Sequence, residues 1–403
     1  MQFGNDTNEL SVINEDENIN DSGSDNQPIS IDGSMTEPEN DLVGVDFTES
    51  QTEISEIECY KSVLLHMVVY EGNLELVQDL IKAGANIESL DSDGSTPLYT
   101  ASEKGHNEIV QELLKNGAKI NVECQNNSPL LIAIDNEHVE TALILVDHGA
   151  DVNFRDGDGS TPLHGAASLG LTKVVKAILK QDCSSSINVQ DNVNHDTPLI
   201  RAIENDHDKI AIELLNHGAD SNIKDWEDET PLYKSACLGK HKVVSELLKH
   251  GAFPDLLNGQ FQQTALMGAL RNSQNRNCED IVKELLEAGA NPNLKSSSGS
   301  PTFHLAIYSA NMISLLLEYG ADVNVQDRFG MTALNLILYI SLTLSEGQIT
   351  KVVERLLRCQ NINLKIRTFG KTPLEIALQR GFKQIVKIIL RRTLFLSVKN
   401  SIN

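Results

Sequence analysis

The feature that most constrains this chain is a short word, Thr-Pro-Leu, that recurs at intervals of about 33 residues. Complete copies begin at Thr96, Thr161, Thr197, Thr230 and Thr372, and degenerate copies begin at Ser128, Thr264 and Thr332. A second word, Gly-Ala, follows most copies at a nearly constant distance. Self-similarity at this period is the signature of a stack of similar units rather than of separate globular domains.

Each position of the repeated words has a physical role. The Thr hydroxyl can cap the free N–H groups at the start of a helix, and Pro is tolerated in the first turn. A glycine such as Gly105, Gly170 or Gly239 ends this short first helix, because a positive φ is easiest for glycine. A second helix follows with apolar residues at helical spacing, as in 109–114. Each unit therefore predicts two short antiparallel helices followed by a loop.

The most regular unit reads DGSTPLHGAASLG over Asp158–Gly170, and this pattern resembles the ankyrin repeat. The resemblance covers ten units over 58–392. It implies an all-α solenoid of helix-turn-helix units with projecting hairpins. We expect a disordered acidic N-terminal tail over 1–57 and a short C-terminal extension over 393–403.

The charge distribution supports this division of the chain. Residues 1–57 hold 15 Asp or Glu and no Lys or Arg, whereas 351–403 hold 12 Lys or Arg and 2 acids. A segment with one sign of charge and few apolar residues cannot offset its chain entropy by forming a core. The formal net charge of −24 disfavours a general nucleic-acid binder, because affinity for phosphates comes mainly from Lys and Arg.

Composition also bounds the compartment. The six cysteines are widely spaced and include no C-x-x-C pair, which is typical of reduced intracellular thiols. The N-terminus shows no basic and apolar leader, and the longest apolar stretch, Ala333 to Leu344, is too short to span a bilayer. We expect a soluble monomer of the cytoplasm or nucleus that does not bind membranes.

Patterns for enzymatic or metal chemistry are weak. Gly370-Lys371-Thr372 resembles the end of a phosphate-binding loop, but Lys365 stands where that loop needs its first glycine. The histidines recur in equivalent repeat slots along the stack, so they should not converge on one ion. In the resembled family the slot after Leu, here His66, His164 and His304, uses histidine for backbone hydrogen bonds. We expect no catalysis, no cofactor and no metal.

The resemblance places partner binding on a concave face lined by first helices and hairpin tips. Candidate residues there are the aromatics Trp226, Phe261, Phe329 and Phe369, the acids Asp156, Asp158, Asp225 and Asp228, and the bases Arg328 and Arg367. Large aromatic side chains at interface centres often dominate affinity. The alternative is that the phenylalanines simply pack on the adjacent hairpin. Acidic tips in the first half predict a partner with a basic segment.

The predicted function is non-catalytic protein–protein recognition as a scaffold, adaptor or inhibitor. Two alternatives stay open, namely a substrate-recruiting subunit of a ubiquitin ligase and a fragment of a longer ankyrin-repeat receptor or channel. The first alternative requires a docking box beside the repeats, and no clear F-box or suppressor-type box is found. Fold alone does not decide among these roles.

Overall fold

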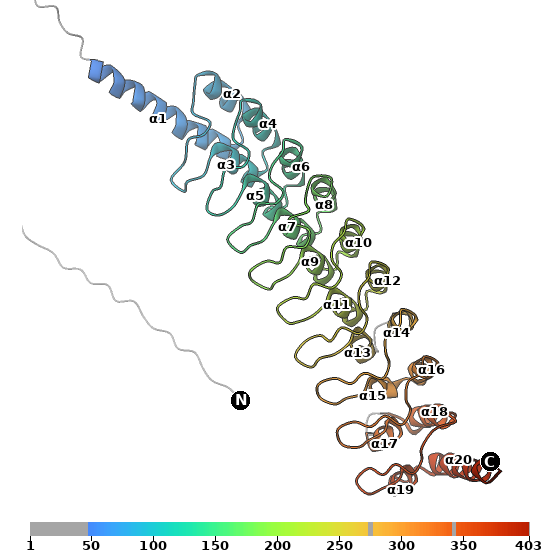
Figure 1. Cartoon of the computed structure of the whole chain (residues 1–403). Helices are drawn as coiled ribbons and strands as arrows, with labels where there is room; N and C mark the ends of the chain where they lie inside the picture. The colour runs from blue at the N-terminus through green and yellow to red at the C-terminus, as the bar shows by residue number, and fades with distance from the viewer. Residues whose placement is uncertain (1–46, 273–276, 341–343, 403) are drawn as a thin grey trace, which may run out of the picture. The chain divides into compact units, whose positions relative to one another are not determined.

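The computed structural model describes residues 47–272, 277–340 and 344–402, and over these ranges the chain forms twenty α-helices in ten successive pairs. Residues Thr52–Asn403 form one compact unit. In this unit the first helices of the pairs form one row beside the loops, and the second helices form a neighbouring row (Figure 1).

The first helices are α1 (Phe47–Glu71), α3 (Pro97–Lys104), α5 (Pro129–Asp135), α7 (Pro162–Ser168), α9 (Pro198–Glu204), α11 (Pro231–Leu238), α13 (Ala265–Arg271), α15 (Thr302–Leu305), α17 (Ala333–Tyr339) and α19 (Pro373–Gln379). The second helices are α2 (Leu74–Lys82), α4 (Asn107–Lys115), α6 (Val139–Asp147), α8 (Thr172–Ile178), α10 (Asp208–Asn216), α12 (His241–Lys249), α14 (Cys278–Glu287), α16 (Ala310–Glu318), α18 (Glu346–Leu357) and α20 (Lys383–Ile402). A 3₁₀ turn, η1 (Ala306–Tyr308), continues α15.

The helix ends form as the repeated words predict. The Thr230 hydroxyl accepts a hydrogen bond from the backbone N–H of Tyr233 at 3.2 Å, with Pro231 in the first turn of α11. Gly239 ends the same helix with a φ of 75°, and its backbone N–H donates to the carbonyl groups of Ala236 and Ser235. Because one capping bond contributes about 1 kcal/mol, its repetition along the stack favours the short helices cumulatively.

The core is one continuous layer between the two rows of helices. It extends from Leu65 to Ile389 and includes most of the leucines of the complete Thr-Pro-Leu words. Leu163 and Leu199 are fully buried. A single pair of helices could not bury both of its apolar faces, so neighbouring units stabilise one another.

The loops are held by turns and by bonds between neighbours, and no strand is present over the described ranges. Isolated β-bridges close four of these loops. Adjacent loops are also joined, because the Trp226 N–H donates to the Asn194 carbonyl at 2.9 Å and the Gly259 N–H donates to the Asp228 carbonyl at 3.0 Å. Such bonds fix the spacing between neighbouring loop tips.

Helices extend into both terminal segments of the chain. Helix α1 begins at Phe47, so the end of the segment expected to be disordered is helical, and residues 1–46 lie outside the described residues. At the other end α20 runs from Lys383 through Ile402 without a break near residue 392. The apolar residues that follow Arg392 continue the helical pattern and therefore extend the last helix. Among the described helices, none has the combination of length and apolar character that crossing a membrane requires.

Candidate functional site

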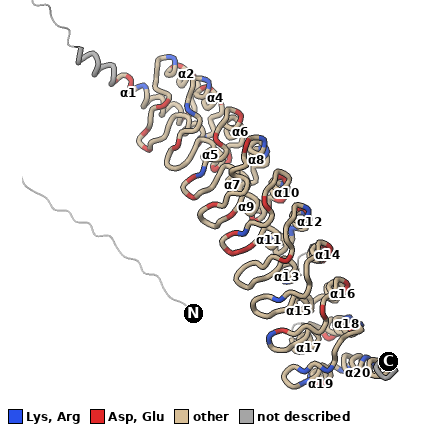
Figure 2. The backbone as a smooth tube through the Cα atoms, viewed as in Figure 1, with Lys and Arg blue, Asp and Glu red and all other residues tan. Residues whose placement is uncertain are grey.

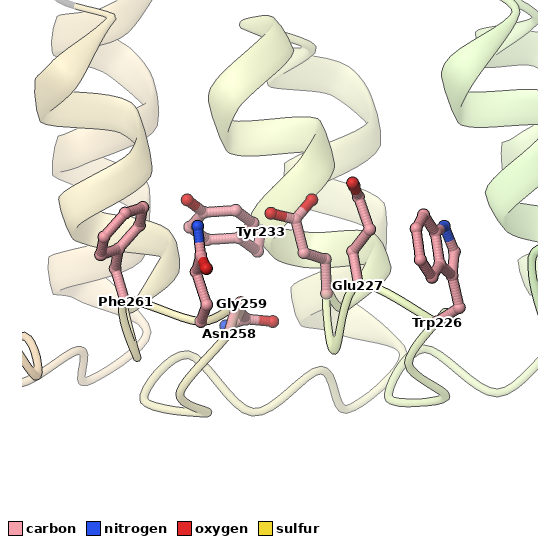
Figure 3. A pocket seen from close by; sticks show the side chains of 8 residues that line it. Trp226, Glu227, Tyr233, Asn258, Gly259 and Phe261 are labelled. Carbon is pink, nitrogen blue, oxygen red and sulfur yellow. The ribbon is translucent and has the colours of Figure 1, made fainter.

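A pocket of about 420 Å³ lies between the loops that precede α11 and α13 (Figure 3). Its lining residues are Trp226, Glu227, Glu229, Tyr233, Asn258, Gly259, Gln260 and Phe261. The pocket therefore combines three aromatic rings with two carboxylates.

Two exposed rings mark the ends of this pocket. The Trp226 side chain stands on the loop before α11 and is 66% exposed, whereas Phe261 stands on the next loop and is 50% exposed. Both project to the same side of the loops as Tyr233, which lies between them (Figure 3). The loop–loop hydrogen bonds at Trp226 and Gly259 hold the two tips in this arrangement.

Tyr233 belongs to the rigid part of the pocket. It lies on α11, its N–H is bound by the Thr230 cap, and its hydroxyl lies 3.1 Å from the side-chain amide of Gln263. Burial and the negative charge of neighbouring groups raise the pKa of Tyr233 above its ordinary value. The phenol is therefore neutral at physiological pH and presents a ring face and a hydrogen-bonding tip.

Lys234 lies beside the pocket and forms ion pairs with four carboxylates. Its ammonium lies 2.6 Å from Glu204 Oε1 and 2.7 Å from Asp225 Oδ2, with Glu229 at 3.6 Å and Glu227 at 4.0 Å. Burial alone would lower the pKa of Lys234, but the bonds to Asp225 and Glu204 outweigh it and raise the pKa. Lys234 is thus a permanent cation between loops and helices of adjacent repeats.

A second ion-pair cluster extends from these ion pairs toward the preceding repeat. Arg201 Nη2 lies 2.8 Å from Asp191 Oδ2, and Arg201 Nε lies 3.1 Å from Asp196 Oδ2. Burial opposes ionisation of Asp191, but the hydrogen bonds from Arg201 lower the pKa of Asp191. For Asp196, burial and the nearby Glu204 raise the pKa to about 6. The pKa of Asp191 therefore lies below the ordinary aspartate value and the pKa of Asp196 lies above it, although both residues belong to one loop.

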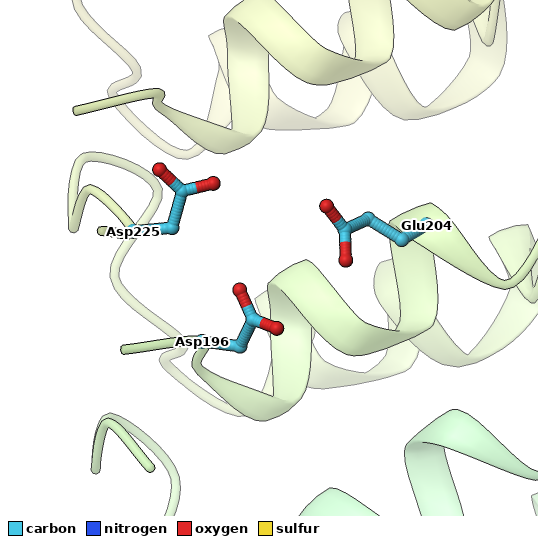
Figure 4. Close-up of side chains that lie close together, drawn as sticks. All are labelled: Asp196, Glu204 and Asp225. Carbon is cyan, nitrogen blue, oxygen red and sulfur yellow. The ribbon is translucent and has the colours of Figure 1, made fainter. Parts of the chain in front are cut away.

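Three carboxylates from this region lie close enough together to suggest a metal site. Oxygen atoms of Asp196, Glu204 and Asp225 all lie within 4.8 Å of one another, as Figure 4 illustrates. However, the Lys234 ammonium already lies within hydrogen-bonding distance of Glu204 and Asp225. A divalent ion would have to compete with this cation, so the cluster is better described as an ion-pair network.

The predicted acidic residues divide into two kinds. Asp225 does not face a partner as expected, because its side chain is 1% exposed and bound to Lys234. Asp156 accepts hydrogen bonds from the N–H groups of Asp158 and Ser160 at 2.9 and 2.8 Å, so it shapes its own turn. Asp158 remains exposed, and Asp228 binds Lys224 at 2.8 Å while half of its side chain stays exposed. The loop acids are visible in Figure 2 along the first repeats.

The predicted aromatics and bases of the last repeats do not join this pocket. Phe369 makes an edge contact with Tyr339, with ring centroids 5.9 Å apart. The Arg328 guanidinium lies 4.7 Å from the Phe329 ring centroid. Arg367 donates to the Gly370 carbonyl at 2.5 Å. The four candidate aromatics therefore divide between one shared pocket, formed with Trp226 and Phe261, and two local contacts, made by Phe329 and Phe369.

Sequence reasoning did not single out Tyr233 or Lys234. Tyr233 occupies the slot after Leu, where His164 and His304 instead bind the carbonyls of Asp196 and Met331 at 3.0 and 2.8 Å. Tyr99 stands in the same slot and is buried, so the slot alone did not identify Tyr233 as a pocket residue. The Tyr233 ring is partly buried and lines the pocket between two repeats, whereas the His164 and His304 rings are buried and used for backbone contacts.

The thiol beside the pocket is suited to packing rather than to chemistry. Cys237 lies on α11, and burial raises its pKa to about 11. A nucleophilic cysteine needs a lowered pKa, since the thiolate is the reactive form. Cys237 therefore lacks the environment that a nucleophilic thiol requires.

Comparison with known proteins gives matches across the described stack. The family model described as ankyrin repeats in three copies matches residues 65–156, 151–225, 224–296, 273–339 and 303–400. The chain is 29% identical over 262 residues to an ankyrin repeat protein of fowlpox virus, covering 65% of this chain and 53% of that protein.

Two other relatives are much longer than this chain. It is 27% identical to the E3 ubiquitin-protein ligase KEG of Arabidopsis thaliana, over 62% of this chain and 14% of that protein. It is 31% identical to a transient receptor potential cation channel subfamily A member 1 homolog of Caenorhabditis elegans, over 30% of this chain and 10% of that protein. In these matches the chain spans about half or less of each relative.

Proposed function

Because this chain belongs to the ankyrin-repeat family, whose repeats mediate protein–protein interaction, we propose that it acts without catalysis as a scaffold, adaptor or inhibitor. The binding surface is formed by the first helices and the loop tips. The observation that carries this proposal is the pocket that the exposed Trp226 and the half-exposed Phe261 share on adjacent loops. Large aromatic side chains exposed on a rigid framework are typical interface anchors.

The partner in this proposal is a protein with a basic segment that lies along the acidic loops of the first repeats. Asp158 and Asp228 keep exposed carboxylates on these loops, whereas the last loops carry Arg328 and Arg367. Complementary charge accelerates encounter and sets the register of the partner. The protein acts as a monomer in the cytoplasm or nucleus and needs no nucleic acid, membrane or cofactor for this role.

A capture experiment tests the surface directly. The full chain is compared with a Trp226→Ala, Phe261→Ala variant and with a control, Tyr319→Ala, which removes a partly exposed ring from the end of α16 on the opposite row. We expect the double variant to lose specific partners that the control retains. Capture of the same partners in equal amounts by all three proteins contradicts the proposed surface.

The similarity to a ubiquitin ligase and to a channel homolog motivates a second candidate role, as the recognition part of a larger assembly of either type. Association with ubiquitin-transfer components in the same capture experiment would favour the ligase role. Both relatives share only repeats over a small fraction of their length with this chain, so the interaction module is the common element.

A further inference from the structure

We infer that the pocket between Trp226 and Phe261 binds the guanidinium group of an arginine side chain from a protein partner. This inference rests on the proposed function and deepens it by naming the group that is recognised. It follows from the charge, the ring arrangement and the size of the pocket.

Negative charge exceeds positive charge around the pocket. Four carboxylates, those of Glu204, Asp225, Glu227 and Glu229, lie within 4.0 Å of the single ammonium of Lys234. The nearby Arg271 approaches the Gln263 amide at 2.7 Å and supplies one further cation. Two carboxylate charges therefore remain uncompensated even when Arg271 is counted.

The carboxylates that line the pocket are the two that lie farthest from the Lys234 ammonium. Asp225 and Glu204 make the short bonds to Lys234, whereas Glu227 and Glu229 are held at 4.0 and 3.6 Å. The Glu227 side chain is also 55% exposed. Burial raises the pKa of Glu229, and an added cation would favour its ionised form. A cationic side chain in the pocket would therefore pair with carboxylates that Lys234 neutralises only in part.

The rings favour a planar cation over a compact one. Trp226, Tyr233 and Phe261 are arranged along the pocket on two neighbouring repeats. A guanidinium can stack on an aromatic face while its N–H groups donate to carboxylates, whereas an ammonium is more strongly hydrated and acts as a point charge. The neutral amide of Gln260 adds a hydrogen-bonding group to the lining of the pocket.

The size of the pocket indicates that the arginine arrives as part of a chain. A volume of about 420 Å³ falls within the range of ligand sites and leaves room beside one side chain. The pocket also continues the row of loops, where a partner segment would lie. Arginine in an extended basic segment therefore fits the site.

Trp226 provides a specific probe, because it is the only tryptophan of the chain and it lines the pocket. The full chain is titrated with a Gly/Ser peptide carrying one central arginine while tryptophan emission is followed. Identical peptides carry lysine, trimethyl-lysine or citrulline. We expect saturable binding with a dissociation constant on the order of 1 mM for arginine, and about tenfold weaker binding for citrulline.

Matched variants separate the pocket from general charge attraction. Glu227→Gln and Phe261→Ala should each weaken the arginine peptide by about fivefold, in line with the loss of one charged or cation–π contact. Phe329→Ala removes an equivalent loop ring outside the pocket and should leave binding unchanged. Circular dichroism checks that every variant keeps its helices.

Several outcomes would overturn the inference. These are no change in Trp226 emission with the arginine peptide, equal affinity for arginine and citrulline, tighter binding of lysine or trimethyl-lysine than of arginine, or equal losses in the Phe261 and Phe329 variants. The titration uses no cellular partner. It can therefore fail while protein capture still depends on the loop surface, and capture can fail while the peptide binds, so the two proposals are tested separately.

Discussion

The ammonium of Lys234 lies 2.7 Å from a carboxylate oxygen of Asp225, and both side chains are at most one-tenth exposed. The pair joins helix α11 to the loop that precedes it, and the Glu204 carboxylate at 2.6 Å extends the contact to α9 of the previous repeat. An ion pair therefore holds two repeats together at this position, whereas most contacts between repeats are apolar.

Replacing Lys234 by methionine should lower the free energy of unfolding by about 3 kcal/mol, because Asp225 would be left as a buried, unpaired charge. Urea denaturation followed by circular dichroism measures the change. The control is Lys82→Met, since Lys82 pairs with Asp79 at 3.2 Å while both side chains are largely exposed. That change should cost less than about 1 kcal/mol. Equal losses in the two variants would contradict a structural role for the buried pair.

Gly268 allows the close approach of α13 to α11. A Cβ atom at this position would lie 2.6 Å from Cys237 Sγ and 3.1 Å from the Tyr233 ring. Gly268→Ala should therefore destabilise the protein by about 1–3 kcal/mol through overpacking. Gly347 in α18 has open space around the same position, so Gly347→Ala should be neutral or slightly stabilising.

A double variant tests the cause of this loss. Adding Cys237→Ala to Gly268→Ala removes the nearest clashing atom and should recover part of the lost free energy of unfolding. Purely additive losses in thermal or urea denaturation would show that the clash with Cys237 is not responsible.

The local structure of each repeat was predictable because its causes are local. Thr230 and Pro231 start a helix and Gly239 ends one through contacts within a few residues, and the repetition of these signals identified the stack. The family and the all-α solenoid are confirmed.

The site was predictable only in part because its contacts join different repeats. Asp225 has the same turn context as exposed loop acids, and only the position of Lys234 on the following helix reveals that it is buried and paired. Similarly, Trp226 and Phe261 were recognisable as loop aromatics. That they share one pocket with Tyr233, while Phe369 packs on Tyr339, depends on side-chain directions across adjacent loops.

Buried His164 should make stability depend on pH. Its ring nitrogens bind the Thr161 cap and the Asp196 carbonyl, and burial lowers its pKa from about 6.5 to about 4. The folded state thus favours neutral histidine, so this contribution is complete above the unfolded pKa and is lost as pH falls from about 6.5 toward 4. Urea denaturation at several pH values measures it.

The comparison protein for this effect is His164→Gln, which cannot take up a proton. Its free energy of unfolding should be lower than that of the wild type at neutral pH, because the ring contacts are lost. The difference between the two proteins should narrow as pH falls through the same window. A difference that stays constant from pH of about 7 to about 4 would exclude His164 as the source.

Phe369 offers a way to separate packing from partner binding on the last loop. It has a left-handed φ of 50°, which is costly for a bulky side chain, and it is 69% exposed. Its edge contact with Tyr339 is the feature that offsets this strain.

Phe369→Ala should therefore lower the free energy of unfolding by about 1 kcal/mol, because the ring contact is lost while the strained backbone remains. Phe369→Gly removes the contact and the strain together and should cost less than Phe369→Ala, as measured by urea denaturation. If alanine and glycine are equally tolerated, and Tyr339→Ala also leaves stability unchanged, the ring is free of a packing role and its exposure is available for a partner.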